Sequence, residues 1–402
     1  MTRTILHLDL DAFFCAVEEG RNPKLRGQKF AVGGQPGQRG VVSSCSYPAR
    51  QFGVHSAMPM SQAVRLCPGL IVVPADHNAY SEVSHKVMAL LGEITPLIEQ
   101  ISIDEAFLDI TPQNGEATAR RLQAIINDEL HLPCSFGVST NKLVAKIANN
   151  VGKALKGKDA PPNAIQVVPP GGEAAFLAPL PINELWGVGP KTADRLRNLG
   201  IQTIGDLAEW REGDLVVMLG KHGADLSREA RGIDDRPVET ERDTKSISRE
   251  TTFTRDVTDL DLLRRTIRQL SEGVGWRVRK EGLRGNTVKL KIRWADFTTL
   301  TRQQTFPQAV DADADIEQAA QTLFRNVWTR GQAVRLIGVG VSGFDDEPQQ
   351  MALFADEAKP SAAPAPDKES QLRLQDTLDT LRDRFGESIV KRGSDLRKNK
   401  KS

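Results

Sequence analysis

Two pairs of carboxylates are the residues of this chain best placed to do chemistry. The first pair, Asp9 and Asp11, lies in ILHLDLDAFF, where three leucines alternate with polar residues. A period of two predicts a strand with the leucines on one face and both carboxylates on the other. After Asp11 the apolar spacing becomes helical, so the pair marks the end of the strand.

The second pair, Asp104 and Glu105, lies in QISIDEAFLDI. The apolar residues before this pair and those after it have opposite parity, so a regular strand does not fit. A tight turn or a bulge is the simplest prediction. At a turn, both side chains can converge on one point.

If three or four of these carboxylates meet, they repel one another and raise one another's pKa values. A hard cation is the natural compensation, and ligation by oxygen alone favours magnesium or manganese over zinc. The alternative is that each pair is an ordinary surface or helix-capping feature.

Two further segments supply cationic groups. SYPARQFGVHSAMP (46–59) contains Tyr47 and Arg50 three positions apart, and FGVSTNKLVAKIANNVGK (136–153) predicts a helix with lysines along one face. A cationic stripe beside a metal site suits a polyphosphate. Without the carboxylates, this segment would be interpreted as an amphipathic surface helix.

Composition limits the class of protein. The chain has 402 residues, with 53 Lys and Arg against 52 Asp and Glu, and four cysteines. Its length predicts two to four domains. The cysteines have no paired spacing, so we expect no zinc site or disulfide framework but a reduced, cytoplasmic protein. The sequence predicts no membrane span and no secretion signal.

The balanced charge conceals a basic block. Between Arg264 and Arg302, eleven Lys and Arg stand against three acidic residues, a local charge of +8. Within the block, NTVKLKIRW alternates apolar residues with Lys289, Lys291 and Arg293, which predicts a strand with a cationic face. Such a face suits a phosphate backbone, and the alternative is a solvated surface.

Breaks in the sequence divide the chain. Residues 1 to about 168 mix strand-like and helical patterns, and VVPPGG (167–172) ends this stretch. Helical patterns then continue to a second break at 234–243, after which strands and helices alternate to residue 344. The segment 357–369 has the composition of a disordered linker.

In this order, the segments resemble a known family. LDLDAFFCAVE, SYPARQFGVHSAMP, SIDEAFLD and FGVSTNKLVAKIA resemble the catalytic motifs of Y-family translesion DNA polymerases, in particular the DNA polymerase IV (DinB) branch. The resemblance continues through LWGVGPKTADRLRNLGI, ARGIDDRPV and KSISRETTF and covers about residues 4 to 344. It implies an enzyme that adds dNTPs to a primer 3′-hydroxyl and bypasses lesions with low fidelity and no proofreading.

The fold implied by this resemblance is an α+β multidomain, right-hand polymerase with palm, small fingers, helical thumb and α/β little finger. The expected domains are the palm at 1–11 and 75–165, the fingers at 12–74, the thumb with a helix-hairpin-helix at 166–236, the little finger at 242–344, and a tail at 345–402.

The resemblance also implies the metal site. Asp9, Asp104 and Glu105 would be the catalytic carboxylates, and together with the carbonyl of Leu10 they would hold two Mg²⁺ ions, for which Mn²⁺ can substitute. Asp11 then becomes a supporting residue, a choice that the alternation alone leaves open.

The incoming nucleotide has its own implied contacts. Ser44, Tyr47 and Arg50 would hold the triphosphate with Lys153 on the opposite side, and Phe14 would be a steric gate that excludes a 2′-hydroxyl. The segment ALKGKDAPPNA replaces a shorter turn of the family, so the lysines at 156 and 158 are alternatives for the triphosphate contact.

Two features predict DNA contacts. A Gly-Val-Gly-Pro turn at 187–190 joins two short predicted helices, as in a helix-hairpin-helix, whose backbone N–H groups bind phosphate without reading bases. Its expected contacts are Gly187, Gly189 and Lys191. The cationic strand face, Lys289, Lys291 and Arg293, is expected to follow the backbone of primer–template DNA.

The tail has two predicted elements. QMALF (350–354) resembles the peptide with which bacterial polymerases bind the sliding clamp, the β subunit, and Gln350, Leu353 and Phe354 would make the contacts. Beyond the linker, apolar spacing predicts an amphipathic helix within about 370–393 whose partner is unknown. We expect a monomer that binds primer–template DNA, a dNTP and the clamp.

Two other classes of function stay open on the residues alone. A metal-dependent nuclease could combine an acidic cluster with a helix-hairpin-helix, but it would not need cations for a triphosphate. A non-catalytic scaffold on DNA and clamp would not need the catalytic carboxylates. Primer extension with dNTPs and Mg²⁺ separates the three.

Overall fold

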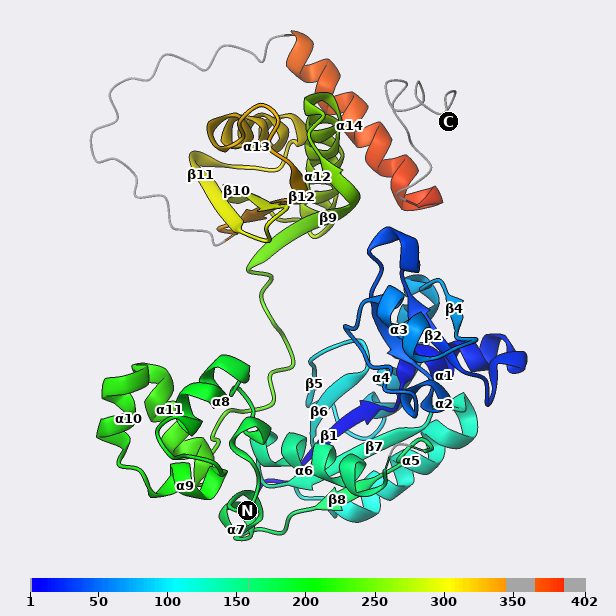
Figure 1. Cartoon of the computed structure of the whole chain (residues 1–402), viewed down its shortest axis with the longest axis vertical. Helices are drawn as coiled ribbons and strands as arrows, with labels where there is room; N and C mark the ends of the chain where they lie inside the picture. The colour runs from blue at the N-terminus through cyan, green and yellow to red at the C-terminus, as the bar shows by residue number, and fades with distance from the viewer. Residues whose placement is uncertain (1, 158, 345–365, 387–402) are drawn as a thin grey trace. The chain divides into compact units, whose positions relative to one another are not determined.

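The computed structural model describes residues 2–157, 159–344 and 366–386, with side chains except those of 366–372. The chain divides into two compact units, Met1–Arg242 and Asp243–Ser402, each with its own core (Figure 1). Among the described helices, none has both the length and the apolar composition needed to cross a bilayer.

The first unit is built around a five-stranded sheet with the strand order β5-β6-β1-β7-β8. Neighbouring strands are antiparallel except β7 and β8, which are parallel. The strands are β1 (Ile5–Leu10), β5 (Ile98–Gln100), β6 (Glu105–Asp109), β7 (Cys134–Ser139) and β8 (Ile165–Val167).

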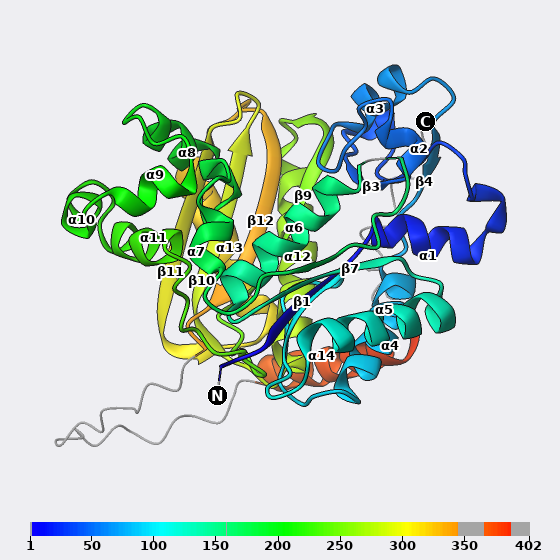
Figure 2. The ribbon, with the colours of Figure 1, turned by 90° about the horizontal axis from the view of Figure 1, so that it is seen from below.

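The predicted alternation along β1 is confirmed. Its three leucines are buried in a core shared with α4 (His77–Gly92) and α5 (Gly115–Leu130). The opposite face, with His7 and Asp9, lies against α6 (Lys142–Leu155). Figure 2 shows α6 on one side of β1 and β7, with α4 and α5 on the other. The middle strand therefore points its polar residues at a single helix.

A smaller sheet with the order β3-β2-β4 follows β1 in the chain and has a separate small core. The elements of this segment are α1 (Phe13–Arg21), β2 (Phe30–Gly33), β3 (Val42–Cys45), α2 (Tyr47–Arg50), α3 (Met60–Leu66) and β4 (Ile71–Val73), with 3₁₀ turns at Pro23–Leu25 and Pro36–Gln38.

A helical segment completes the first unit. Its elements are α7 (Glu173–Leu177), a 3₁₀ turn (Ile182–Glu184), α8 (Pro190–Arg197), α9 (Ile204–Glu209), α10 (Glu212–Leu219) and α11 (Lys221–Ala230). Leu177, Leu196 and Leu226 share one core with Leu143 and Ile147 of α6. Helix α6 therefore packs on β1 with one face and on the helical segment with the other.

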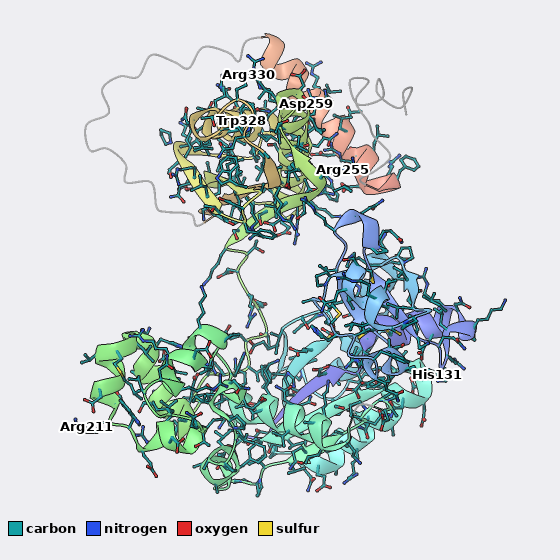
Figure 3. The ribbon with its side chains drawn as sticks, viewed as in Figure 1. His131, Arg211, Arg255, Asp259, Trp328 and Arg330 are labelled. Atoms are coloured by element: carbon teal, nitrogen blue, oxygen red, sulfur yellow. The ribbon has the colours of Figure 1, made fainter. Side chains whose placement is uncertain are left out.

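The second unit is a four-stranded antiparallel sheet with the order β11-β10-β12-β9 and two helices in contact with it. The elements are β9 (Ser246–Val257), α12 (Leu260–Lys280), β10 (Gly285–Trp294), β11 (Thr299–Val310), α13 (Asp313–Val327) and β12 (Val334–Ser342). Trp328, labelled in Figure 3, directly follows α13. Its ring stacks on that of Phe324, with centroids 5.5 Å apart.

A last helix, α14 (Pro366–Phe385), packs on the same unit through ionic contacts. Arg279 of α12 donates from Nε to Asp379 Oδ2 at 2.7 Å and from Nη2 to Asp379 Oδ1 at 3.1 Å. Arg382 is only 9% exposed and lies 3.6 Å from Glu272. The Trp276 indole N–H donates to Asp383.

The predicted helix beyond the linker is therefore confirmed, and the partner that the sequence left unknown is α12. Leu381 and Phe385, which belong to the predicted stripe, are exposed, and Arg382 is buried instead. The helix begins at Pro366 and ends at Phe385, and residues 387–393 of the predicted range lie outside the described part of the chain. Complementary charges on α12 contact it.

Candidate active site

The predicted turn before β6 is confirmed. Ile101 N–H donates to the Glu105 carbonyl at 3.0 Å, which closes the hairpin between β5 and β6. Ser102 Oγ donates to Asp104 Oδ1 at 2.6 Å and accepts from the Glu105 N–H at 3.0 Å. The serine therefore fixes both acidic residues of the pair at the tip of the hairpin.

Asp9 lies directly beside this hairpin. It is paired with Glu105 in the register of β1 and β6, and Leu10 N–H donates to the Asp104 carbonyl at 3.0 Å. Residues opposite one another in an antiparallel pair point to the same face of the sheet. The three carboxylates from two distant segments are thus gathered at one end of the sheet.

Asp11 has a different environment from Asp9. Its carboxylate is buried and accepts hydrogen bonds from Ser135 Oγ, at 3.1 and 2.9 Å, and from the Asn163 N–H, at 3.1 Å. The Asp9 side chain is 18% exposed. The two residues that look equivalent in the sequence differ because Asp11 joins the end of β1 to β7 and to the loop before β8.

Two lysines of α6 face the carboxylates. Lys153 Nζ lies 2.6 Å from Asp9 Oδ1 and 3.0 Å from Asp11 Oδ1, and Lys146 Nζ lies 2.7 Å from Glu105 Oε2. The lysines are two helical turns apart and so share one face of α6. They compensate negative charge that would otherwise be poorly solvated.

The electrostatics of Asp9 are those of a crowded carboxylate. Burial, the largest cause, raises its pKa, Lys153 opposes this effect, and Glu105 and Asp104 add to it, so that the pKa lies at about 7. Any additional positive charge placed beside Asp9 would therefore stabilise its ionised form.

The donor chemistry fits a hard divalent cation, because every candidate ligand is a carboxylate or carbonyl oxygen. Within the described residues, no three Asp, Glu, His or Cys side chains already form a metal cage. Asp9 and Glu105 each contact a lysine instead. A bound divalent cation would take over the neutralising role of these two ammonium groups.

A cavity of about 460 Å³ opens beside the carboxylates. It brings together all five predicted nucleotide contacts and three of the four predicted metal ligands, whereas Glu105 is not part of its lining. The relevant lining residues are Asp9, Leu10, Phe14, Ser44, Tyr47, Arg50, Asp104 and Lys153.

Of the alternative lysines, Lys156 is exposed at the C-terminal end of α6 and Lys158 lies outside the described residues. Lys153 lines the cavity itself. The geometry therefore favours Lys153 for a contact inside the cavity.

The cationic wall of the cavity is held in place. The Arg50 guanidinium carbon lies 4.8 Å from the centre of the Tyr47 ring, and Arg50 Nε donates to the Cys45 carbonyl at 3.2 Å. Burial raises the pKa of Tyr47, so its phenol keeps its proton. Together, Tyr47 and Arg50 offer hydrogen-bond donors to an anion.

Phe14 lies at the edge of this cavity and rests on another ring. It stacks on Tyr80 of α4, with centroids 4.3 Å apart and an interplanar angle of 13°. His77 stands edge-on to both rings, 6.0 Å from each. The motif spacing could not identify Tyr80 as a neighbour of Phe14, because the two residues are 66 positions apart. The helical apolar pattern of its segment only places Tyr80 on a buried face.

Two other neighbours of the site were missed in the sequence. His7 is fully buried, and its Nδ1 lies 3.0 Å from Asn149 Nδ2. Burial, with lysine charges nearby, lowers the pKa of His7 well below its usual value, so the ring is neutral. The centre of the Trp186 ring lies 5.7 Å from Lys146 Nζ and 5.0 Å from the guanidinium carbon of Arg236. These contacts are tertiary and leave no local pattern.

The predicted helix-hairpin-helix turn keeps its glycines exposed. Gly187 has φ +95°, a left-handed conformation that glycine adopts without strain, and Val188 is buried beneath the turn. Gly189 precedes Pro190, the first residue of α8, and Lys191 is exposed. The element before the turn, however, is only the 3₁₀ turn Ile182–Glu184 and not the predicted helix.

The predicted cationic strand is β10. Its apolar residues are buried, and Lys289, Lys291 and Arg293 lie on the other face. In the neighbouring strand, Gly338 and Gly340 stand opposite the two lysines and add no side chains. Lys291 Nζ reaches across Gly338 to Glu250 Oε2 at 2.7 Å.

The rest of the basic block is divided between different surfaces. Six of its eleven cationic residues lie on α12. Of these, Arg279 is paired with Asp313 and Asp379. The sequence count of +8 therefore overstates the charge that any single face presents. The predicted clamp residues Gln350, Leu353 and Phe354 lie outside the described part of the chain.

Comparison with known families gives three matches along the chain. The impB/mucB/samB family matches residues 8–150, the HHH motif of the IMS family matches residues 170–201, and the C-terminal domain of the impB/mucB/samB family matches residues 244–353. The matches cover both units and the helical segment.

Curated relatives and solved structures agree with these matches. DNA polymerase IV of Listeria monocytogenes serotype 4b is 41% identical over 346 residues, which are 85% of this chain and 95% of the relative. DNA polymerase IV of Dehalococcoides mccartyi is 39% identical over 401 residues, 98% of each chain.

Among solved structures, a Y-family DNA polymerase chimera of Dbh and Dpo4 has a TM-score of 0.75 at 27% identity. An insertion ternary complex of Dbh DNA polymerase has a TM-score of 0.60, also at 27% identity. Each comparison covers 85% of this chain and 99% of the other.

Proposed function

This chain belongs to the impB/mucB/samB family of Y-family translesion DNA polymerases, and we propose that Asp9, Asp104 and Glu105 form its catalytic centre. It is a DNA-directed DNA polymerase with the right-hand fold of palm, fingers, thumb and little finger. It acts on primer–template DNA and dNTPs, and its family is metal-dependent. Neither a nuclease nor a non-catalytic scaffold has support from its relatives.

We assign the palm to residues 1–11 and 75–165, because these supply the five-stranded sheet, except the last two residues of β8, and its helices. The fingers are residues 12–74, with the three-stranded sheet, and the thumb is 166–236, with α7 to α11. The little finger is 242–344, and residues 345–402 are its tail.

Two Mg²⁺ ions are the proposed cofactors, held by Asp9, Asp104, Glu105 and the carbonyl of Leu10. When bound, such ions supply activation of the primer 3′-hydroxyl and stabilisation of charge on the phosphates. The chain's own part is to hold the carboxylates in place: Ser102 fixes Asp104, and Lys146 orients Glu105. Asp11 supports the end of β1 through Ser135 and Asn163.

We propose that Ser44, Tyr47, Arg50 and Lys153 bind the triphosphate and that Phe14 excludes the 2′-hydroxyl of a ribonucleotide. Lys153 can exchange its contact with Asp9 for a phosphate oxygen, since both are anionic and it lines the cavity. The single observation that carries this proposal is the cavity, in which carboxylates, cationic groups and one stacked ring meet. Primer extension by carboxylate variants tests it.

The proposed DNA contacts are the thumb turn, with Gly187, Gly189 and Lys191, and the face of β10. We expect replacement of Lys289, Lys291 and Arg293 by alanine to weaken primer–template binding and to reduce its dependence on salt. Each lost phosphate contact lowers the slope of log K against log salt by about 0.9. Lys291, which already pairs with Glu250, should contribute least.

Fluorescence anisotropy with labelled primer–template DNA at several salt concentrations measures both quantities. A matched triple variant on the helical side of the same unit, Arg264→Ala, Arg265→Ala and Arg277→Ala, should bind as the parent does. Equal weakening in both triple variants would contradict a specific role for the strand face.

We propose that QMALF (350–354) binds the sliding clamp and that the polymerase itself is a monomer. Alanine at Gln350, Leu353 and Phe354 should remove the stimulation of primer extension by the clamp and leave extension without the clamp unchanged. Alanine at Gln349, Asp356 and Lys359 is the matched control. Full stimulation of the first triple variant would refute the assignment.

A further inference from the structure

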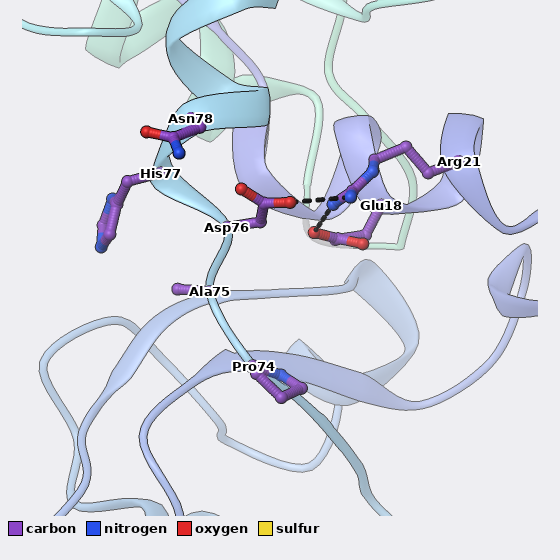
Figure 4. Close-up of a pocket in the computed structure, with 7 residues that line it drawn as sticks. All are labelled: Glu18, Arg21, Pro74, Ala75, Asp76, His77 and Asn78. Atoms are coloured by element: carbon purple, nitrogen blue, oxygen red, sulfur yellow. Dashed lines mark hydrogen bonds and ion pairs between the residues drawn. The ribbon is translucent and has the colours of Figure 1, made fainter. Parts of the chain in front are cut away.

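Three residues on one stripe of α1 face the start of α4. Phe14, Glu18 and Arg21 are four and three positions apart, the spacing of one helical face. Each contacts a residue of α4 or its cap, so three contacts connect the two helices in order along α1. Figure 4 shows the outer part of this set, with Arg21 between Glu18 and Asp76.

The first two contacts meet at Tyr80. Its ring is fully buried and stacks on Phe14, and its hydroxyl donates to Glu18 Oε1 at 2.7 Å. Burial raises the pKa of Tyr80, so the phenol keeps its proton and remains the donor. Glu18, only 6% exposed, is therefore the acceptor that fixes how Tyr80 sits beneath Phe14.

The third contact holds Glu18 itself. Arg21 donates from Nη1 to Glu18 Oε1 at 3.0 Å and from Nη2 to Asp76 Oδ2 at 2.7 Å. Asp76 also caps α4 by accepting from the Ala79 N–H at 3.2 Å. Arg21 and Asp76 border an open hollow of about 610 Å³ and are roughly half exposed, so this outer contact is the weaker one.

We propose that Glu18 is a positioning residue for sugar discrimination: through Tyr80 it fixes the Phe14 ring at the nucleotide cavity, and Arg21 and Asp76 hold Glu18 in place. The inference rests on the proposed role of Phe14 as the steric gate. It adds that Phe14 can exclude the hydroxyl because the Tyr80 ring beneath it is held in place.

The physical reason is that a ring excludes a hydroxyl only if it cannot retreat. Phe14 is partly exposed at the cavity, so its own burial does not lock it. Behind it, Tyr80 is immobilised at its far end by a hydrogen bond to a buried carboxylate. Without that bond, the stacked pair can shift together, and the extra oxygen of a ribonucleotide meets less resistance.

The test compares selectivity, defined as kcat/KM for a dNTP divided by kcat/KM for the matching rNTP. Both values come from one enzyme preparation, so the inactive fraction cancels. Tyr80→Phe keeps the stacked ring and removes the hydroxyl, and Glu18→Gln keeps the size and removes the charge. Asp76→Asn removes the outer ion pair but retains an N-cap acceptor. Glu19→Gln, next to Glu18 but outside the stripe, is the matched control.

We expect selectivity to fall about three- to tenfold in Tyr80→Phe, the loss that corresponds to one hydrogen bond. Glu18→Gln should lower it less, because the amide oxygen can still accept from the Tyr80 hydroxyl while the charge of the acceptor is lost. Asp76→Asn should lower it about twofold, because exposed ion pairs are weak. In all three variants kcat/KM for the dNTP should change less than twofold, and Glu19→Gln should match the parent.

Unchanged selectivity in Tyr80→Phe would overturn the proposal, and so would an equal loss of kcat/KM for both nucleotides, since that is a general structural effect. If Glu18→Gln does not fold, Tyr80→Phe still tests the same hydrogen bond from its other end. Phe14→Ala is measured alongside. If Phe14→Ala also keeps full selectivity, the assignment of Phe14 as the gate is wrong. If Phe14→Ala loses selectivity but Tyr80→Phe keeps it, only the proposed role of Glu18 is removed.

Discussion

Replacement of Asp104 by alanine is expected to abolish primer extension while primer–template DNA still binds. Asp104 lines the cavity next to Asp9 and presents its carboxylate from the tip of the β5–β6 hairpin. Loss of a carboxylate that holds a catalytic ion removes several kcal/mol of transition-state stabilisation. With tenfold in rate for each 1.36 kcal/mol, extension should fall by roughly a thousandfold or more.

Single-turnover extension with dNTPs and Mg²⁺ measures the loss, and anisotropy measures DNA binding in parallel. Asp104→Asn keeps the size of the side chain and should be nearly as inactive, because a neutral amide compensates less charge. Asp128→Ala, at an exposed position of α5, is the control and should extend normally. Extension at the parental rate by Asp104→Ala would remove Asp104 from the catalytic centre.

Phe14→Ala is expected to admit ribonucleotides. The ring lies at the cavity edge on top of Tyr80, so its removal opens space beside the position proposed for the sugar. A single misplaced small group is discriminated by roughly 10- to 200-fold in a packed pocket, and we expect a loss of selectivity in this range. Incorporation of dNTPs should fall much less, since the carboxylates and the cationic wall are unchanged.

Competition between dNTP and rNTP in primer extension measures the effect. Phe52→Ala removes an exposed ring of the same segment, whose centre lies 4.8 Å from Lys29 Nζ, and should keep parental selectivity. Retained discrimination in Phe14→Ala would mean that another residue checks the sugar.

Much of the site could be predicted because its signals are local. The alternation in β1 gives the orientation of Asp9, the change of parity gives the turn at Asp104, and helical spacing places the lysines on one face of α6. Each of these patterns repeats within a few residues. A period can therefore be measured from the sequence alone.

What could not be predicted depends on contacts between distant segments. Asp11 differs from Asp9 only because Ser135 and Asn163 reach it across the fold. Tyr80 and Trp186 likewise acquire their neighbours through tertiary packing. The partner of α14 could not be named for the same reason: the leucine spacing predicts the helix, but its contacts are charged groups and an indole N–H of α12, far away in the sequence.

Because α14 packs on the second unit, the tail is attached to this unit at two places and not at one. Residues 345–365 are joined to β12 through Phe344 at one end and to a docked helix at the other. A partner bound to residues 350–354 would therefore be connected to the second unit at both ends of this segment, through β12 and through α14.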